Sequence, residues 1–121
     1  MFHMAVDKRI SFGCASGSAC TYKNRMVNNV GIEMASVISG FNEQYDIDDL
    51  VKCIAPRELL IVSADNDKYS KDADDVYQKA KSIYEYHNSK NKLQHKRYHG
   101  GHAMTEERFG YIVNWFCCHI G

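Results

Sequence analysis

The sequence Leu59-Leu60-Ile61-Val62-Ser63-Ala64-Asp65-Asn66-Asp67 is an apolar run that ends in an acidic turn. A short continuous run of aliphatic residues is typical of a strand buried on both faces of a parallel sheet. Leu93 to Tyr98 predicts another strand, more polar and therefore nearer the sheet edge, and Gly100-Gly101-His102 follows it. Parallel strands end at the same edge of a sheet, so we expect the residues after these two strands to lie close together.

The rest of the chain predicts an alternation of strands and helices. The expected elements are a first strand at 9–15, a short helix at 46–54, a helix at 72–87 with Ser70 as its N-cap, and a last helix capped by Thr105. The buried stripe of that last helix is expected to be Phe109, Ile112, Val113, Phe116 and Ile120. This order predicts an α/β fold: a short parallel sheet with flanking helices, in a single domain over residues 1–121.

Composition excludes several classes of protein. The chain has 121 residues, of which 45% are hydrophobic, enough for one core. Lys+Arg and Asp+Glu both count 15, so the formal net charge is zero, and no basic block favours nucleic acid or an anionic membrane. No apolar run approaches the roughly 18 residues of a membrane span. The segment 1–5 is too short for the apolar part of a signal peptide. We therefore expect a soluble, cytoplasmic protein.

The five cysteines give an odd count with no Cys-x-x-Cys pair. This favours reduced thiols that are mostly buried and act as small hydrophobic residues, in keeping with a reducing compartment. The sequence predicts no metal and no cofactor.

His102 and Asp67 are the candidate catalytic residues. A histidine that takes a proton and later returns it needs one free ring nitrogen and a carboxylate that holds the other. Gly100 and Gly101 permit a tight backbone path that places His102 over the end of the sheet, and Asp67 follows a neighbouring strand at the same edge. The plainer interpretation is that His102 packs near a helix start and that Asp67 is one turn aspartate among several.

Other candidate sites have weaker patterns. His95, His99 and His102 suggest a metal, but one lies inside a strand and the others in a loop, so they need not converge. Asp65-x-Asp67 begins like a calcium loop, but the later positions of that motif do not fit. Two serines, Ser16 and Ser18, follow the first strand and are candidate nucleophiles outside the usual frame. Cys14 and Cys20 are further, weaker candidates for the nucleophile. The remaining candidates for a substrate pocket are Tyr22, Lys23 and Arg25, which a solvated loop also explains.

Several motifs together resemble the C-terminal half of dienelactone-hydrolase-like α/β-hydrolases, a group that includes acetyl-xylan-esterase-type and prolyl-oligopeptidase-type enzymes. The motifs are Asp46-Ile47-Asp48-Asp49-Leu50, Ile54-Ala55-Pro56-Arg57, Leu59-Leu60-Ile61-Val62, Gly100-Gly101-His102-Ala103 and Glu106-Glu107-Arg108-Phe109. The resemblance covers nearly the whole chain. The chain departs from the family at Glu58, where a proline is frequent. The position of the family's acid favours Asp67 over Asp65.

The resemblance implies a partial α/β-hydrolase fold that lacks its N-terminal half. It implies that His102 is the general base and acid of a Ser-His-Asp triad, that Asp67 orients it, and that the substrate is a small-molecule ester or related acyl compound. No Gly-x-Ser-x-Gly occurs in the chain, so the nucleophile is expected to be absent and the chain inactive alone. The alternative is a non-enzymatic remnant or interaction module that keeps the half-fold as a scaffold.

Such a half-fold would leave a strand unpaired around Ile10, Phe12 and Cys14, with apolar surface from Phe2, Met4 and Val6. Exposed edges and apolar patches recruit partners. We therefore expect a homo-oligomer through the N-terminal strand, with a two-fold pairing of edge strands as the simplest closed form.

Overall fold

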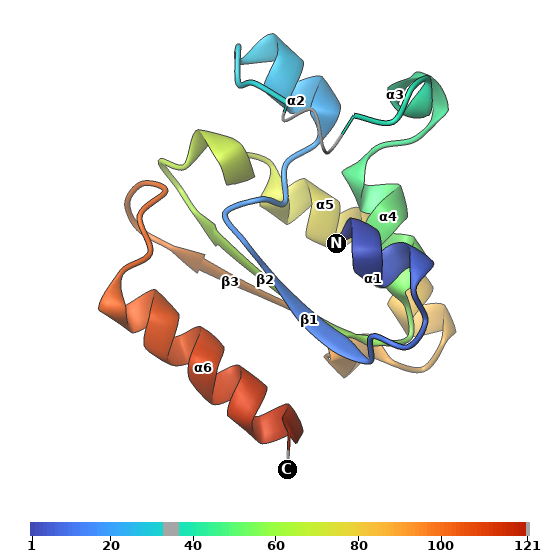
Figure 1. Ribbon diagram of the computed structural model, residues 1–121, viewed down its shortest axis with the longest axis vertical. Helices are drawn as coiled ribbons and strands as arrows, with labels where there is room; N and C mark the ends of the chain where they lie inside the picture. The colour runs from blue at the N-terminus through green and yellow to red at the C-terminus, as the bar shows by residue number, and fades with distance from the viewer. Residues whose placement is uncertain (33–36, 121) are drawn as a thin grey trace.

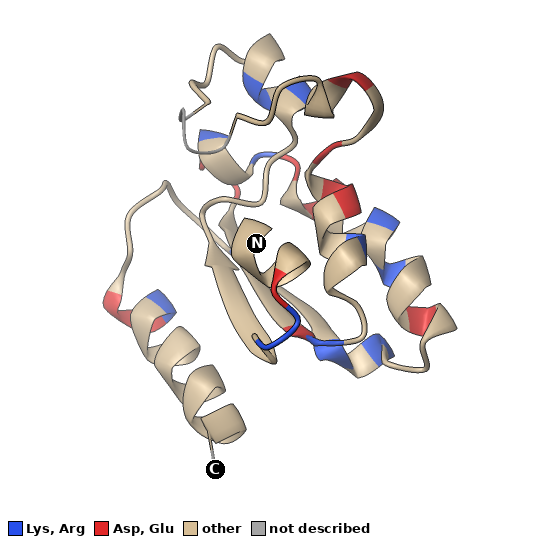
Figure 2. Cartoon of the chain, turned by 45° about the vertical axis from the view of Figure 1, so that its right-hand side comes forward, with Lys and Arg blue, Asp and Glu red and all other residues tan. Residues whose placement is uncertain are grey.

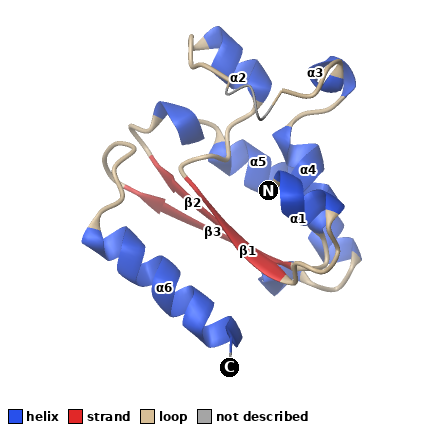
Figure 3. Cartoon of the chain, in the orientation of Figure 1, coloured by secondary structure: helices blue, strands red, loops and turns tan. Residues whose placement is uncertain are grey.

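The computed structural model describes residues 1–32 and 37–120, which form one parallel sheet with helices on both faces (Figures 1 and 3). The strands are β1 (Phe12–Ser16), β2 (Glu58–Ala64) and β3 (Leu93–Tyr98), in the order β1-β2-β3. The helices are α1 (Phe2–Val6), α2 (Tyr22–Val27), α3 (Phe41–Gln44), α4 (Ile47–Ile54), α5 (Ala73–Tyr86) and α6 (Glu106–Ile120), with short 3₁₀ helices at Lys68–Ser70 and Lys90–Lys92. The predicted α/β fold is confirmed.

The central strand β2 explains how the layers are arranged. Its side chains alternate between the two faces of the sheet. Leu59 and Ile61 pack with residues of α1, α4 and α5, whereas Leu60 and Val62 pack with Trp115 of α6. All four are at most 1% exposed, which confirms the prediction of a strand buried on both faces. β3 lies at the edge of the sheet, as its polar sequence predicts.

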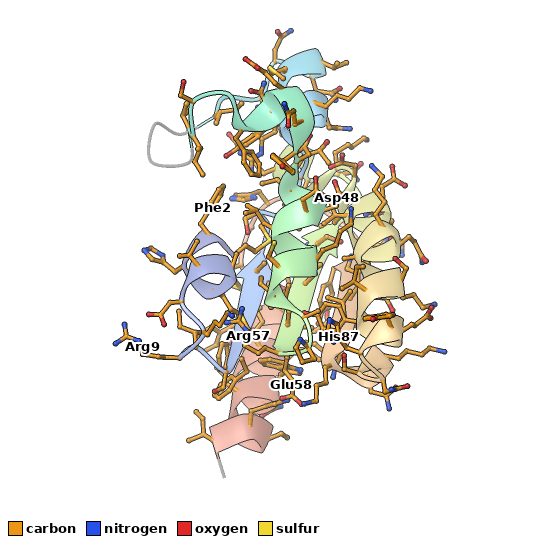
Figure 4. The ribbon with its side chains drawn as sticks, turned by 90° about the vertical axis from the view of Figure 1, so that its right-hand side faces the viewer. Phe2, Arg9, Asp48, Arg57, Glu58 and His87 are labelled. Carbon is orange, nitrogen blue, oxygen red and sulfur yellow. The ribbon has the colours of Figure 1, made fainter. Side chains whose placement is uncertain are left out.

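The first strand begins later than the predicted 9–15. The segment before it is a turn in which the Asp7 carboxylate pairs with Arg9. Arg57, labelled in Figure 4, donates from Nη1 to the carbonyl oxygens of Asp7 and Ile10 at 3.0 Å each. These carbonyls are therefore engaged by a guanidinium, and pairing with β2 starts at Phe12.

The predicted cap of the long helix is wrong by two residues. Asp72 is the N-cap of α5, and the Ser70 hydroxyl instead donates to the Asp67 carboxylate. The starts of the other two predicted helices, α4 and α6, agree with the sequence to within one residue, whereas α1, α2 and α3 were not predicted. Asp46 and Asp49 form a capping box at α4, and the Thr105 hydroxyl accepts the backbone N–H of Arg108 in α6.

The predicted buried stripe of α6 is also wrong in part. Phe109, Val113 and Ile120 are exposed, while Arg108 and Trp115 are buried and Ile112 and Phe116 are half-buried. The helix is rotated so that Trp115 meets Leu60 and Val62 and Arg108 reaches the loop after β3. Beyond Arg108 the helix contains no lysine, arginine, aspartate or glutamate (Figure 2), and His119 in its last turn contacts Glu58. Its outer face is therefore apolar and open.

Two further expectations are corrected. Met4 lies in the core at 4% exposure and is not part of an apolar surface, although Val6 is 80% exposed. The cysteines are not mostly buried: Cys53, Cys117 and Cys118 are exposed, Cys14 is half-buried and Cys20 is buried. Within residues 1–32 and 37–120, no helix is long and apolar enough to cross a membrane.

Candidate active site

The candidate site lies at the carboxyl edge of the sheet, where β2 and β3 end. Asp67 follows β2 and is the N-cap of the 3₁₀ helix Lys68–Ser70. His102 follows β3, in the loop that leads to α6. Two parallel neighbouring strands thus bring the two residues together, although 35 positions separate them in the chain.

The Asp67 carboxylate is buried and well supplied with donors. It is 2% exposed, and it accepts the Tyr69 backbone N–H on Oδ1 at 2.9 Å and the Ser70 hydroxyl on Oδ2 at 2.8 Å. Burial alone raises the pKa of this carboxyl, but the hydrogen bonds from Ser70, Tyr69 and His102 outweigh it and hold the pKa below its ordinary value. Asp67 is therefore an anion at neutral pH.

The His102 ring lies against this anion. Its Nδ1 is 3.1 Å from each carboxylate oxygen of Asp67, within the range expected for a catalytic pair. The side chain is 57% exposed, and its Nε2 has no hydrogen-bond partner in the described part of the chain. One ring nitrogen is thus held by a carboxylate and the other is free to exchange a proton. The catalytic role of the pair stays a prediction.

The loop that carries His102 is fixed by two charged residues. The Asp65 carboxylate accepts the Gly100 backbone N–H at 2.8 Å and lies 2.7 Å from His99 Nδ1. The His99 contact and the Gly100 N–H lower the pKa of Asp65. Asp65 is therefore an anchor for the histidine loop and makes no hydrogen bond to His102 in the described residues.

Arg108 fixes the same loop from the other side. It is 5% exposed, and its guanidinium donates to the carbonyl oxygens of Gly101 and Ala103 at 2.8 Å and of His99 at 3.2 Å. Sequence reasoning missed this role, because an arginine after acidic residues in a first helical turn is usually solvated. A buried cation that binds three loop carbonyls restricts where His102 can lie.

Gly17 directly follows β1 and lies close to both His102 and Asp67. Its φ is +60°, and a Cβ there would lie 2.9 Å from His102 Cε1 and 3.3 Å from Asp67 Oδ2. A side chain at this position is thus disfavoured both by the backbone conformation and by the contact with the His102 ring. The glycine pattern of this loop gave no hint of this contact in the sequence.

Two cavities open beside His102. The larger has a volume of about 520 Å³, and its lining is Met1, Phe2, Ser16, Gly17, Ser18, Tyr22, Arg25, Ile32, Ile47, Tyr69 and His102. The smaller, of about 360 Å³, is lined by Ser16, Gly17, Val62, Ser63, Asp67, His102, Ala103, Met104 and Arg108. Tyr22 and Arg25 thus line the larger cavity, whereas Lys23 lines a separate one of about 330 Å³ with Asp46, Asp72 and Lys79.

The remaining candidates lie apart from this pair or lack the right chemistry. His95 contacts Ser63 and Asp74, so it does not meet His99 and His102. No group of metal-ligating side chains converges anywhere in the described ranges. Burial raises the pKa of both Cys14 and Cys20 to about 11, so little nucleophilic thiolate forms at neutral pH. Ser16 and Ser18 line the larger cavity with His102 and stay alternative nucleophiles.

No family model matches this chain, and no curated protein does. Solved structures do match. A CE15 esterase from a marine bacterial metagenome aligns with 91% of this chain at a TM-score of 0.69 and 18% identity, and the match covers 36% of that structure. The glucuronoyl esterase from Solibacter usitatus aligns with 92% of this chain at a TM-score of 0.68 and 16% identity, covering 37% of that structure. A CE15 glucuronoyl esterase from Caldicellulosiruptor kristjansonii aligns with 93% of this chain at a TM-score of 0.66 and 17% identity, and the match covers 38% of that structure.

The fold is that of part of an α/β-hydrolase. This confirms the fold expected from the sequence, and the similar structures are esterases. The chain spans little more than a third of the length of these three structures. A specific likeness to dienelactone hydrolases stays a prediction.

Proposed function

We propose that this chain provides the acid and the general base of a Ser-His-Asp triad that hydrolyses ester or related acyl bonds of a small molecule. The hydrogen-bonded pair of Asp67 and His102 at the carboxyl edge of the sheet carries the proposal. His102 Nε2 would take the proton of the attacking hydroxyl and return it to the leaving group. Asp67 would orient the ring and stabilise the imidazolium. The esterase activity named for the similar structures supports this class of reaction.

We further propose that the nucleophilic serine comes from a segment outside these 121 residues. In α/β-hydrolases the nucleophile precedes the acid and the histidine in the chain and sits in a Gly-x-Ser-x-Gly turn, and this sequence contains no such turn. The share of the esterase structures that the chain covers, 36% to 38%, is in keeping with this. A cytoplasmic location is proposed as well, because it suits free cysteines.

Hydrolysis of p-nitrophenyl acetate by the isolated chain tests where the nucleophile lies. Wild type should form no acetyl-enzyme with this ester, because the base has no nucleophile to activate, and its hydrolysis should exceed that of His102→Ala by no more than the about tenfold expected of His102 acting on water. A fluorophosphonate that labels activated serines should leave the chain unmodified. Rapid turnover that needs His102 and stops on labelling of Ser16 or Ser18 would show that the nucleophile lies within the chain.

A further inference from the structure

The larger cavity beside His102 has an uneven distribution of charge. One arginine, Arg25 of α2, lines it, whereas no aspartate or glutamate among residues 1–32 and 37–120 does. Phe2 and Ile47 contribute apolar surface, and Figure 4 shows Phe2 at the end of α1 that faces the α2 and α3 segment. A volume of about 520 Å³ falls within the range of small-molecule sites. The cavity therefore combines room for a ligand body with the guanidinium of Arg25.

The guanidinium of Arg25 is weakly engaged by the protein. Nη2 lies 3.4 Å from the Ser18 carbonyl oxygen and Nη1 lies 3.4 Å from that of Gly31, both at the outer limit of a hydrogen bond. Within residues 1–32 and 37–120 it forms no ion pair with a carboxylate. A guanidinium has five N–H donors, so most of its hydrogen-bonding capacity is available to a ligand.

Tyr69 connects this cation to the candidate base. Arg25 Cζ lies 5.8 Å from the centre of the Tyr69 ring, and the Tyr69 and His102 rings lie 4.7 Å apart. Arg25, Tyr69 and His102 therefore form one continuous wall of the cavity. A ligand with its reacting bond at His102 would have its far end beside Arg25.

We propose that this cavity binds an ester whose acyl or alcohol part carries a carboxylate, with Arg25 as the residue that recognises that carboxylate. This rests on the proposed function, because it takes the cavity beside His102 as the substrate site. A planar guanidinium suits bidentate binding of a carboxylate, and binding there holds the ester bond at the histidine end of the wall. Arg25 is thus a residue for substrate specificity and takes no part in the proton transfer.

The test is a titration of the full 121-residue chain with benzoate and with benzamide, its uncharged counterpart, followed by ¹H–¹⁵N NMR. Benzoate should bind about tenfold more tightly than benzamide, as expected for one charge-assisted interaction, and should shift the amide signals of Gly17 and Ser18 beside the cavity. Arg25→Gln should lose this preference, and Arg25→Lys should keep part of it. Lys23→Gln removes a charge from the same helix outside the cavity and should bind benzoate like wild type. The same spectra show whether each variant is folded.

Equal affinity for benzoate and benzamide would overturn the proposal, and so would unchanged benzoate binding in Arg25→Gln or no binding of either probe at tens of millimolar. His102→Ala should still bind benzoate, because the anion contact lies at the other end of the wall. Failure of the anion site is therefore distinguishable from failure of the proposed triad, because the triad is tested by the reaction of p-nitrophenyl acetate in wild type and His102→Ala, which does not depend on benzoate binding.

Discussion

At the scale of single residues, the Asp67 carboxylate depends on a serine that the sequence had suggested as a helix cap. Ser70 is fully buried, and its hydroxyl donates to Asp67 Oδ2. The structure thus makes Ser70 a support of the candidate acid. An anion this deeply buried needs each of its donors, because an unmet hydrogen-bonding group in the interior costs free energy.

Ser70→Ala should lower the free energy of unfolding at neutral pH by about 1.5–3 kcal/mol, since a buried carboxylate loses a donor. Ser82→Ala, at an exposed serine of α5, should change the free energy of unfolding by less than about 0.5 kcal/mol.

Because the pKa of Asp67 in the folded chain is lowered, the stabilising contribution of this carboxylate is complete above the ordinary aspartate pKa of about 3.9. It is lost as the pH falls through the folded value. The effect of Ser70→Ala should therefore shrink in acid. Urea unfolding checks this, and an equal loss at neutral and acidic pH would contradict it.

Gly17→Ala and Gly110→Ala form a matched pair of substitutions. At Gly17 an added Cβ meets His102 and the φ is positive, so the variant should displace the ring and lower the unfolding free energy by about 1 kcal/mol or more. At Gly110, inside α6, a Cβ meets no atom within 4 Å, so alanine should stabilise the helix by about 0.5–1 kcal/mol. Thermal unfolding together with the His102 NMR signals measures both, and a harmless Gly17→Ala would refute the close contact.

At the scale of elements, β3 is fastened to β2 and α5 through a buried histidine. His95 Nε2 lies 2.7 Å from the Ser63 hydroxyl, and its Nδ1 lies 3.4 Å from Asp74, which also pairs with Arg97. Burial lowers the pKa of His95, with Arg97 adding to the effect and Asp74 opposing it. The ring is therefore neutral in the folded chain at neutral pH, and it ties the strand that leads to His102 to the layer beneath it.

The fold should lose stability in mild acid because of His95. Below the ordinary histidine pKa of about 6.5 the unfolded chain binds a proton that the folded ring resists, so stability falls from that pH down towards the lowered folded value. His95→Gln should reduce the difference in unfolding free energy between about pH 7.5 and about pH 5.5. The control is His87→Gln, at an exposed residue after α5, which should leave that difference as in wild type. A wild-type difference retained in full by His95→Gln would contradict the account.

The sequence predicted the elements that have one dominant pattern. The aliphatic run Leu59 to Val62 is typical of a strand buried on both faces, and neighbouring parallel strands end at the same edge, so Asp67 and His102 could be expected to lie together. The rotation of α6 could not be predicted, because Phe109 and Trp115 are both apolar and helical spacing does not choose between adjacent stripes. Arg108 was missed because its partners are backbone carbonyls, which leave no trace in a sequence.

At the scale of the whole molecule, the free edge of β1 is where a partner would be expected. β1 pairs with β2 on one side and with no other strand of the described residues, and Val6 nearby is 80% exposed. We propose that two copies associate through the N-terminal strand, because unpaired edges and exposed apolar groups favour association.

Val6→Lys should weaken this association, since it places a charge on the exposed end of α1, the helix whose Met4 lies against Gly13 of β1. Val27→Lys is the matched control, because Val27 of α2 is 76% exposed. Sedimentation velocity at micromolar concentration should show dimers for wild type and Val27→Lys and a shift towards monomer for Val6→Lys. A wild-type chain that sediments as a monomer would refute the proposal.

Acyl transfer from p-nitrophenyl acetate to methanol tests the central claim most directly, because methanol can stand in for the hydroxymethyl group of the serine. The reaction forms methyl acetate and p-nitrophenol, and quantifying methyl acetate separates it from hydrolysis. We predict that the wild-type chain forms methyl acetate about tenfold faster than His102→Ala. Asp67→Asn should also form methyl acetate more slowly than wild type. His87→Ala, which removes an exposed imidazole away from the site, should form it at the wild-type rate. Equal rates for wild type, His102→Ala and Asp67→Asn would contradict the claim that this pair is the acid and base of a triad.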